Sequence, residues 1–149
     1  MSDIKTIQFE IVTPERSVMK EEVTQIIVPT KDGEITVLPN HIPLISSLKP
    51  GVLEVKKNNG EVEIISISGG FLEVLKDKVV ILADTAERGH EIDEQRAEEA
   101  RKRAEALMTE AVHKDDVDYA GLSAIIEKEL ARTRAIKKWR RIKHKDNIS

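Results

Sequence analysis

The C-terminal end of the chain carries the densest group of side chains that could bind a partner. Residues 132–149 contain eight basic side chains and one acidic residue, Asp146, for a formal charge of +7. Residues 1–86 and 87–131 carry −4 and −6. A cationic end on an acidic protein attracts acidic partners. The spacing favours an acidic protein surface and a solvated, unbound terminus equally, and nucleic acid or anionic lipid less than either.

No arrangement of side chains is typical of catalysis or of metal binding. The chain has no cysteine and therefore no disulfide, thiolate metal site or cysteine nucleophile. Its four histidines are scattered, without the His or Cys neighbours that a zinc site needs. The acidic residues around 110–118 lack the glycine and the later glutamate of an EF-hand, and helix capping explains them better. The pair Gly69-Gly70 is more typical of a bend than of a phosphate-binding loop. We therefore expect neither enzymatic activity nor a metal site.

The first 86 residues are predicted to form β-strands. Apolar and polar residues alternate over residues 7–12, a period of two that places one apolar set on one face. Asn59-Gly60 separates two alternating runs and is a strong hairpin signal. Further β-branched runs lie at 23–28, 34–38, 51–56, 61–67, 71–75 and 79–83. Short strands at this spacing predict an all-β sandwich or barrel as the N-terminal domain, residues 1–86.

Residues 87–149 are predicted to form an α-helical hairpin as the C-terminal domain. Asp93 is a plausible N-cap for a helix over about 93–112, and Asp116 or Asp118 could cap a second helix over about 118–145. A short polar break between two amphipathic helices indicates an antiparallel pair. The first helix has small apolar residues at 97, 100, 104, 107 and 111, and the second a stripe of Leu122, Ile125, Ile126, Leu130 and Thr133. Both stripes are narrow, so we expect the hairpin to dock weakly and to be able to undock.

Several motifs resemble signatures of the epsilon chain of F-type ATP synthases. Residues 34–44, EITVLPNHIPL, with LKPG at 48–51, resemble the first signature of that family. Residues 68–74, SGGFLEV, resemble the second. Residues 83–89 match the family's exit from its sandwich, and residues 116–120 are similar to the start of its second helix. The resemblance covers nearly the whole chain in the right order, and it implies the same fold, a β-sandwich followed by a helical hairpin.

The resemblance implies a non-catalytic subunit of the central rotor, which couples proton flow to ATP synthesis. In the family the sandwich binds the gamma subunit and rests on the membrane-embedded c-ring, and Glu34 and His41 are placed at this contact. The two helices either fold on the sandwich or extend along the alpha and beta subunits and block ATP hydrolysis. The resemblance implies that, in the extended form, basic side chains of the second helix contact an acidic stretch of the beta subunit. These side chains are Arg132, Arg134, Lys137, Lys138, Arg140 and Arg141.

The same resemblance implies a location at the cytoplasmic face of the inner membrane, as a peripheral subunit. The sequence has neither a run of about 18 apolar residues nor a secretory signal at its start. We therefore expect contact with the membrane only through the complex, and no nucleic-acid partner.

A subset of the family binds ATP in the folded hairpin through the motif [IL]-D-x-x-R-A. The residues that match this motif or the positions around it are Glu87, Ile92, Asp93, Arg96, Ala97, Arg103, Lys128 and Arg132. Lys128 stands where the family has an arginine, and lysine lacks the bidentate fork of arginine. No cofactor is required, and the resemblance suggests ATP as a regulatory ligand. The alternative is a helix N-cap followed by an outward-facing arginine.

Overall fold

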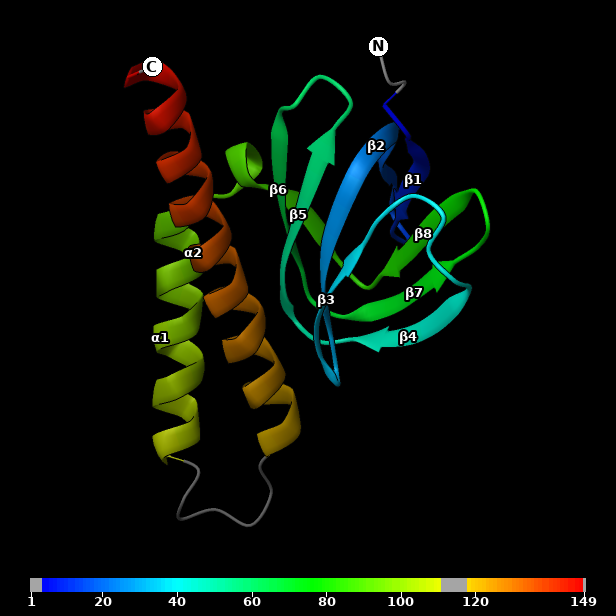
Figure 1. Cartoon of the computed structure of the whole chain (residues 1–149). Helices are drawn as coiled ribbons and strands as arrows, with labels where there is room; N and C mark the ends of the chain where they lie inside the picture. The colour runs from blue at the N-terminus through cyan, green and yellow to red at the C-terminus, as the bar shows by residue number, and fades with distance from the viewer. Residues whose placement is uncertain (1–3, 111–117, 149) are drawn as a thin grey trace.

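A computed structural model describes residues 4–110 and 118–148, which form a β-sandwich followed by two antiparallel helices (Figure 1). The elements are β1 (Ile7–Val12), β2 (Ser17–Thr30), β3 (Gly33–Val37), β4 (Leu44–Leu48), β5 (Gly51–Lys57), β6 (Val62–Ile67), β7 (Gly70–Val74), β8 (Lys78–Ala83), β9 (Ala86–Arg88), the 3-10 turn η1 (Gly89–Glu91), α1 (Glu94–Glu110) and α2 (Tyr119–Ile148). The predicted fold class, an all-β domain followed by a helical hairpin, is confirmed.

The strands form one sheet that folds over itself into two layers. One layer has the order β3–β2–β5–β6–β9, and the other has the order β1–β8–β7–β4. The long strand β2 joins the layers, because its first part pairs with β1 and its last residue, Thr30, pairs with Leu48 of β4. Between the layers lies a continuous apolar core that includes Phe9, Leu53 and Leu72, none more than 1% exposed. Alternating burial along β1 and β8 confirms the period-two pattern.

Two glycines permit local geometries of the sandwich that a residue with a side chain would not, a turn with positive φ and a close approach of two strands. Gly60 adopts a φ of +88° in the β5–β6 turn, whereas Asn59 accepts a hydrogen bond from the backbone N–H of Glu61 at 3.0 Å. Gly70 is packed against β8 so tightly that a Cβ there would lie 2.1 Å from the carbonyl oxygen of Leu82. The Gly69-Gly70 pair therefore permits a close approach of two strands, in keeping with the predicted bend.

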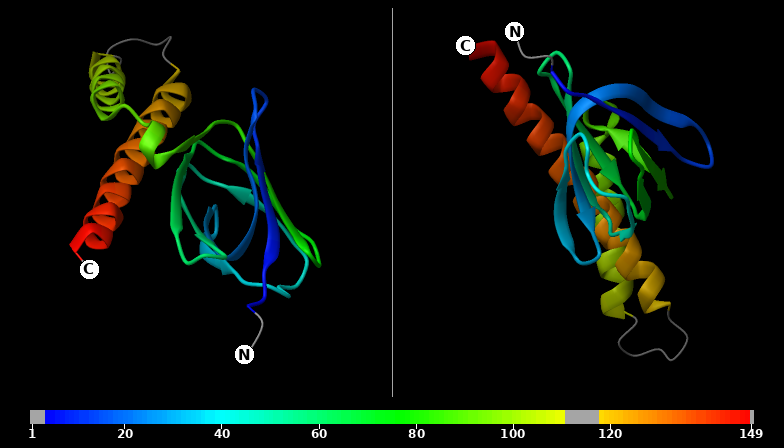
Figure 2. Two further views of the ribbon diagram at one scale, coloured as in Figure 1. Left: turned by 90° about the horizontal axis from the view of Figure 1, so that it is seen from above. Right: turned by 45° about the vertical axis from the view of Figure 1, so that its right-hand side comes forward.

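The strand β6 is buried on both of its faces, which shows where the hairpin rests. Ile65 and Ile67 point into the sandwich core, and Ile64 packs instead with residues of the hairpin. Figure 2 shows α2 lying across the outside of the β5–β6 region, with α1 beside it and farther from the strands. The hairpin is therefore folded onto the sandwich rather than extended away from it.

Both helices begin at aspartate caps. The Asp93 carboxylate accepts the backbone N–H of Arg96 at 3.1 Å, and the Asp118 carboxylate accepts that of Gly121 at 2.8 Å. The alternative cap Asp116 and the predicted polar break at residues 113–116 lie outside the described residues. The helix α2 runs to Ile148, beyond the predicted end near residue 145.

The predicted apolar stripe of the second helix is wrong at two of its five positions. Thr133 is buried, and Leu122 and Ile126 are half-buried. Ile125 and Leu130 are 44% and 39% exposed, and the fully buried positions are Ala131 and Ala135 instead. Alanine permits close approach between helices, and on α1 the buried residues are likewise Ala97 and Ala104. We infer that the two helices meet along small side chains, whereas Ile125 is exposed and Ile136 is buried against the sandwich.

Candidate functional site

The contact between hairpin and sandwich is a small apolar cluster at the chain's exit from the last strand. Its buried members are Ile64, Ile92, Ala135 and Ile136, and Trp139 and Ile142 pack against them while partly exposed. Gly89 of η1 lies beneath Trp139, because a Cβ at position 89 would be 2.8 Å from the Cβ of the tryptophan. This cluster joins β6, the 3-10 turn and α2 at one point.

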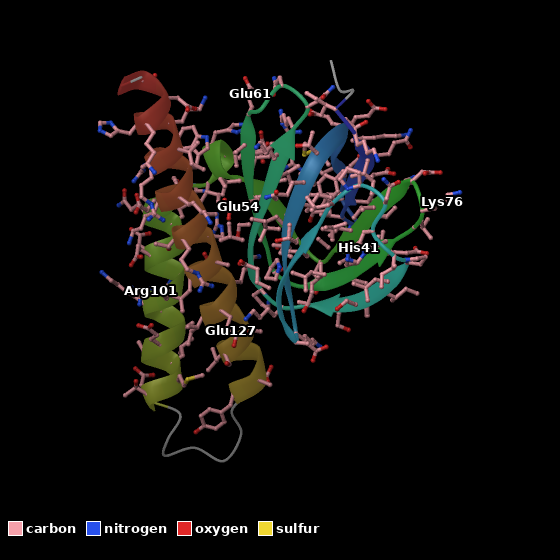
Figure 3. All side chains as sticks on the ribbon, viewed as in Figure 1. His41, Glu54, Glu61, Lys76, Arg101 and Glu127 are labelled. Carbon is pink, nitrogen blue, oxygen red and sulfur yellow. The ribbon has the colours of Figure 1, made fainter. Side chains whose placement is uncertain are left out.

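Ion pairs surround that cluster. Lys138 donates to the Glu54 carboxylate of β5 at 2.5 Å, and the position of Glu54 between α2 and the strands can be followed in Figure 3. Arg140 pairs with Glu94 at the start of α1. Arg16, on the β1–β2 loop, donates to Glu91 of η1 at 2.8 Å. The folded hairpin is therefore held by a few charged contacts at the edge of a modest apolar patch.

The Arg16–Glu91 pair changes the titration of both groups. The hydrogen bond from Arg16 holds the pKa of the Glu91 carboxyl below its ordinary value of 4.5, against the opposing effect of partial burial. The same hydrogen bond and the charge of Glu91 raise the pKa of Arg16. Glu91 also accepts the backbone N–H of Arg88 at 3.1 Å, so its ionised form closes the 3-10 turn.

Among the residues predicted to bind ATP, the structure brings Glu87 and Arg132 into contact. The Nε of Arg132 donates to Glu87 of β9 at 3.0 Å, and its terminal nitrogen donates to Glu129 at 2.7 Å. Burial alone would lower the pKa of Arg132, but the hydrogen bond to Glu129 and the charge of Glu87 outweigh that effect, and the pKa is raised. The guanidinium is therefore already paired with two carboxylates of its own chain.

The remaining predicted ATP residues are distributed around the start of α1. Ile92 is buried in the apolar cluster, and Ala97 is fully buried. The Arg96 side chain is 83% exposed and lies 3.6 Å from Asp93, as expected for an N-cap followed by an outward arginine. Arg103 is exposed and Lys128 is half-buried. The structure thus pairs Glu87 with Arg132, and Asp93 with Arg96. Among the described residues, no ion pair joins Arg103 or Lys128 to either pair.

The six basic residues predicted to face the beta subunit have two different environments. Arg132, Lys138 and Arg140 form the ion pairs described above. Arg134, Lys137 and Arg141 are exposed and line a groove between α2 and the sandwich. Only half of the set is therefore engaged within the folded chain.

The two residues predicted to contact the c-ring and gamma lie at opposite ends of β3. Glu34 is exposed beside the β2–β3 turn, where it is opposite Pro29 in the pairing. His41 follows the other end of β3, and Figure 3 shows it on the side away from the helices. Its Nδ1 is 2.6 Å from the carbonyl oxygen of Ile42, and the preceding Asn40 has a φ of 67°, which shapes the loop.

An apolar strip lies on the exposed face of the β1–β8–β7–β4 layer. Figure 1 shows that this layer is the one farther from the hairpin. Ile45, Phe71 and Leu82 of neighbouring strands β4, β7 and β8 are 75%, 58% and 56% exposed. Phe71 and Leu82 are directly opposite each other in the ladder. Exposed apolar residues gathered on one sheet face are typical of a protein-binding surface.

Sequence reasoning did not single out Ile64, Glu54 or the docking role of Trp139. Consecutive isoleucines at 64 and 65 break the period-two pattern and are a signal of a strand covered on both faces. Ile136, Trp139 and Ile142 repeat every three residues among the basic side chains, which is the spacing of one helix face.

Two further findings concern the described ranges 4–110 and 118–148. No group of three or more His, Cys, Asp or Glu side chains there is arranged to hold a metal ion. No helix there has the length and apolar character required to span a membrane.

Comparisons with known proteins agree with this architecture. Residues 6–89 match the family described as ATP synthase, Delta/Epsilon chain, beta-sandwich domain, and residues 90–137 match its long alpha-helix domain. An ATP synthase epsilon chain of Chloroflexus aggregans is 48% identical over 128 residues, which cover 86% of this chain and 90% of that one. An epsilon chain of Psychrobacter arcticus is 39% identical, covering 91% and 96%.

A solved structure shares the fold. A chain in the cryo-EM structure of the Euglena gracilis mitochondrial ATP synthase, OSCP/F1/c-ring, superposes with a TM-score of 0.70 at 26% identity, covering 89% of this chain and 82% of that chain. These matches confirm the resemblance seen in the motifs and the expectation of a subunit that is not itself the catalyst. The chain belongs to the delta/epsilon chain family of ATP synthases and is an epsilon-type, non-catalytic subunit.

Proposed function

We propose that this chain couples the rotor of a proton-translocating F-type ATP synthase through its sandwich, and restrains ATP hydrolysis through its helices. In this proposal the folded hairpin is the permissive form. When the hairpin leaves the sandwich, the helices insert beside the alpha and beta subunits and block hydrolysis.

The observation that carries this proposal is the modest size of the contact between hairpin and sandwich. A fully buried isoleucine contributes about 1.5–3 kcal/mol. Among the described residues, the part of the chain after β9 buries Ile92, Ile136 and the small Ala135 in the shared cluster, and Trp139 and Ile142 are partly buried against it. The surrounding ion pair of Lys138 with Glu54 is partly exposed, at 36% and 24%, and such pairs contribute up to about 1 kcal/mol each. A contact of this size supports release of the hairpin while the sandwich core stays folded.

The charge on α2 supports an acidic surface of the beta subunit as the partner of the released helix. In the folded form, Arg132, Lys138 and Arg140 pair with carboxylates of the chain itself. Release of α2 from the sandwich and from α1 would free Lys138 and Arg140 and would remove Glu87 from Arg132, which keeps Glu129 on its own helix. Carboxylates of an acidic partner would then replace the lost ones. The 30 residues of α2 span about 45 Å at 1.5 Å per residue, long enough to reach into a neighbouring subunit.

Two different surfaces of the sandwich suit different rotor partners. The apolar strip of Ile45, Phe71 and Leu82 is proposed to bind the gamma subunit, because association of protein surfaces is driven by apolar burial. Glu34 and His41 are proposed to contact the c-ring or gamma from the turns at either end of β3. Contact with the c-ring would hold the chain at the cytoplasmic face of the membrane as a peripheral subunit.

ATP is proposed as a regulatory ligand that binds weakly to the folded hairpin. The support is the motif from Ile92 to Ala97, together with Arg132. The phosphates of ATP would have to displace Glu129 or Glu87 from Arg132, and this displacement reduces the favourable free energy of ATP binding. A ligand that binds only the folded form stabilises it by about 2.7 kcal/mol at a concentration one hundred times its Kd.

Reconstitution with a catalytic head tests the proposal. The chain is expected to co-purify with gamma and to lower the ATPase rate of the head. Titration of ATP into the isolated chain tests the nucleotide site separately, and heat with saturation near millimolar concentration or below is expected.

A further inference from the structure

A groove of about 600 Å³ lies between α2 and the end of the sandwich where β2, β3 and the β4–β5 turn meet. Its floor is formed by Pro29, Pro50, Gly51 and Val52. The floor is closely packed, because a Cβ at Gly51 would lie 2.9 Å from the ring of Pro29. The groove therefore has a rigid, largely apolar base with its polar groups on the walls.

Basic side chains from both domains form the walls. Arg134, Lys137, Lys138 and Arg141 stand on one face of α2, because positions i, i+3, i+4 and i+7 share a helix face. Lys49 faces them from the β4–β5 turn of the sandwich. Four consecutive members of one helix stripe with the same charge repel one another unless an anion lies among them.

Two carboxylates at the margin do not neutralise this charge. Glu34 and Glu127 also line the groove, and Figure 3 shows Glu127 on the part of α2 nearest the α1–α2 connection. Glu54 holds Lys138. In the ranges that the structure describes, no salt bridge holds Lys49, Arg134, Lys137 or Arg141. The hydrogen bond from Arg101 and, to a lesser extent, the charge of Lys137 lower the pKa of Glu98 on α1, so Lys137 lies near a carboxylate. The groove thus presents basic side chains that no salt bridge holds, over a formed cavity.

We propose that this groove binds a small anion with two or more phosphate groups, such as a diphosphate. Guanidinium groups hold phosphate oxygens in bidentate fashion, and lysines add point charges. The lining holds five basic and two acidic side chains, and Glu54 neutralises Lys138, so an excess of two positive charges faces such an anion.

The groove is separate from the residues of the proposed ATP site. Glu87, Asp93, Arg96 and Arg132 are absent from its lining. Arg132 is turned toward Glu87 of β9. Pyrophosphate in the groove and a nucleotide at the motif are therefore distinguishable by mutation.

Anion binding would favour the folded hairpin, because one wall belongs to the sandwich and the other to α2. A ligand that needs both walls binds only the folded form and shifts the equilibrium toward it. The further consequence, that the anion relieves inhibition of hydrolysis, rests on the proposed function above. Binding itself does not depend on it.

Isothermal titration of inorganic pyrophosphate into the full-length chain tests the proposal at low salt. We expect one site per chain, with weaker binding of orthophosphate. Arg134→Gln and Arg141→Gln are each expected to weaken binding about tenfold, the loss typical of a charge-assisted hydrogen bond. Lys143→Gln and Lys145→Gln remove the same charge from exposed positions of α2 outside the groove and are expected to change the affinity less than about twofold.

The outcomes separate the site from its alternatives. Asp93→Ala, which alters the ATP motif, is expected to leave pyrophosphate binding intact, and circular dichroism checks that each variant is folded. Absence of pyrophosphate binding overturns the proposal, as does an equal loss in the groove and control variants. Binding to phosphatidylglycerol vesicles without binding to pyrophosphate also overturns it. Failure of hydrolysis inhibition, with pyrophosphate binding intact, would affect only the proposed function.

Discussion

Trp139 of α2 packs directly over Gly89, at the point where the chain leaves the sandwich, and a methyl group at position 89 would stand 2.8 Å from the tryptophan Cβ. Ile92, three residues after Gly89, is buried in the same apolar cluster as Ile64 of β6. Glycine is required at position 89 because a side chain would collide with Trp139. The backbone does not require it, since the φ of Gly89 is not positive. The environment of Trp139 therefore depends on whether the hairpin is docked. Because Trp139 is the single tryptophan of the chain, its fluorescence measures docking.

Gly89→Ala is expected to loosen the docked hairpin while the sandwich stays folded. The added methyl group overpacks the contact with Trp139, at a cost of about 1–3 kcal/mol. The emission of Trp139 should shift to longer wavelength, because the indole becomes more exposed to water. Ser123→Ala, at an exposed position of α2, is the control and should leave the spectrum unchanged. An unshifted spectrum in Gly89→Ala would show that this contact does not determine docking.

Glu54→Gln is expected to strengthen inhibition of hydrolysis in the assembled head. The substitution removes the partner of Lys138 and weakens docking by about 0.5–1 kcal/mol, a factor of roughly 2–5 in the equilibrium. The fraction of ATPase activity inhibited at low ATP measures this shift. Glu61→Gln makes the same change at an exposed residue of the β5–β6 turn, away from α2, and should have no effect (Figure 3). Equal inhibition in both variants would exclude the Glu54–Lys138 pair from control of the hairpin.

Glu129→Gln is expected to tighten ATP binding by the isolated chain. Glu129 is only 6% exposed and holds a terminal nitrogen of Arg132 at 2.7 Å. Removing its charge makes the terminal nitrogen of the guanidinium available to phosphate, although Glu87 still holds Nε, and we expect an affinity about three- to tenfold higher by titration calorimetry. Glu110→Gln, at the exposed end of α1, serves as the matched control. An unchanged affinity would remove Arg132 from the nucleotide site.

Docking of the hairpin is expected to depend on pH through Glu91. Its pKa lies below the ordinary value of 4.5 because Arg16 donates a hydrogen bond to it. A lowered pKa means that this contact stabilises the fold above about pH 4.5 and is lost as the pH falls through the lower, folded-state value.

Glu91→Gln therefore separates this contribution from other acid effects. The variant should dock less well than the original chain at pH 7, and the difference should shrink as the pH approaches 4. The emission of Trp139 in a denaturant titration at each pH is the measurement. A difference that stayed constant across this range would rule out ionised Glu91 as the anchor of the 3-10 turn.

Local patterns in the sequence predicted the sandwich and both helix starts, because strand alternation and aspartate caps depend on neighbouring residues. Asp93 and Asp118 cap helices as expected. The packed face of α2 was predicted only in part, at Thr133, because its buried alanines are small and the large apolar residues that dock stand among cations. Only the tertiary contact with Ile64 and Gly89 selects Ile136 and Trp139 as the docking face.

The candidate sites were predictable to different degrees. The ATP motif could be recognised from residues 92–97, but the sequence could not show that Arg132 is already held by Glu129 and Glu87. The pair with Glu87 joins β9 to α2, residues 45 apart in the chain, and arises only when the hairpin docks, whereas Glu129 and Arg132 are three residues apart on α2. The basic groove likewise depends on Lys49 of the sandwich meeting a stripe of α2.

The central claim, that the helices restrain hydrolysis while the sandwich maintains assembly, is tested most directly by truncation after Gly89. This boundary keeps β9, whose residues Ala86–Arg88 pair with β6, and removes η1 beyond its first residue together with both helices. The ATPase rate of a reconstituted catalytic head is measured with the full chain and with residues 1–89, at low and high ATP, alongside co-purification with gamma. We predict that the full chain lowers the rate, most strongly at low ATP, and that the truncated chain binds gamma equally well without lowering it. Equal rates with the two chains at every ATP concentration would contradict the claim.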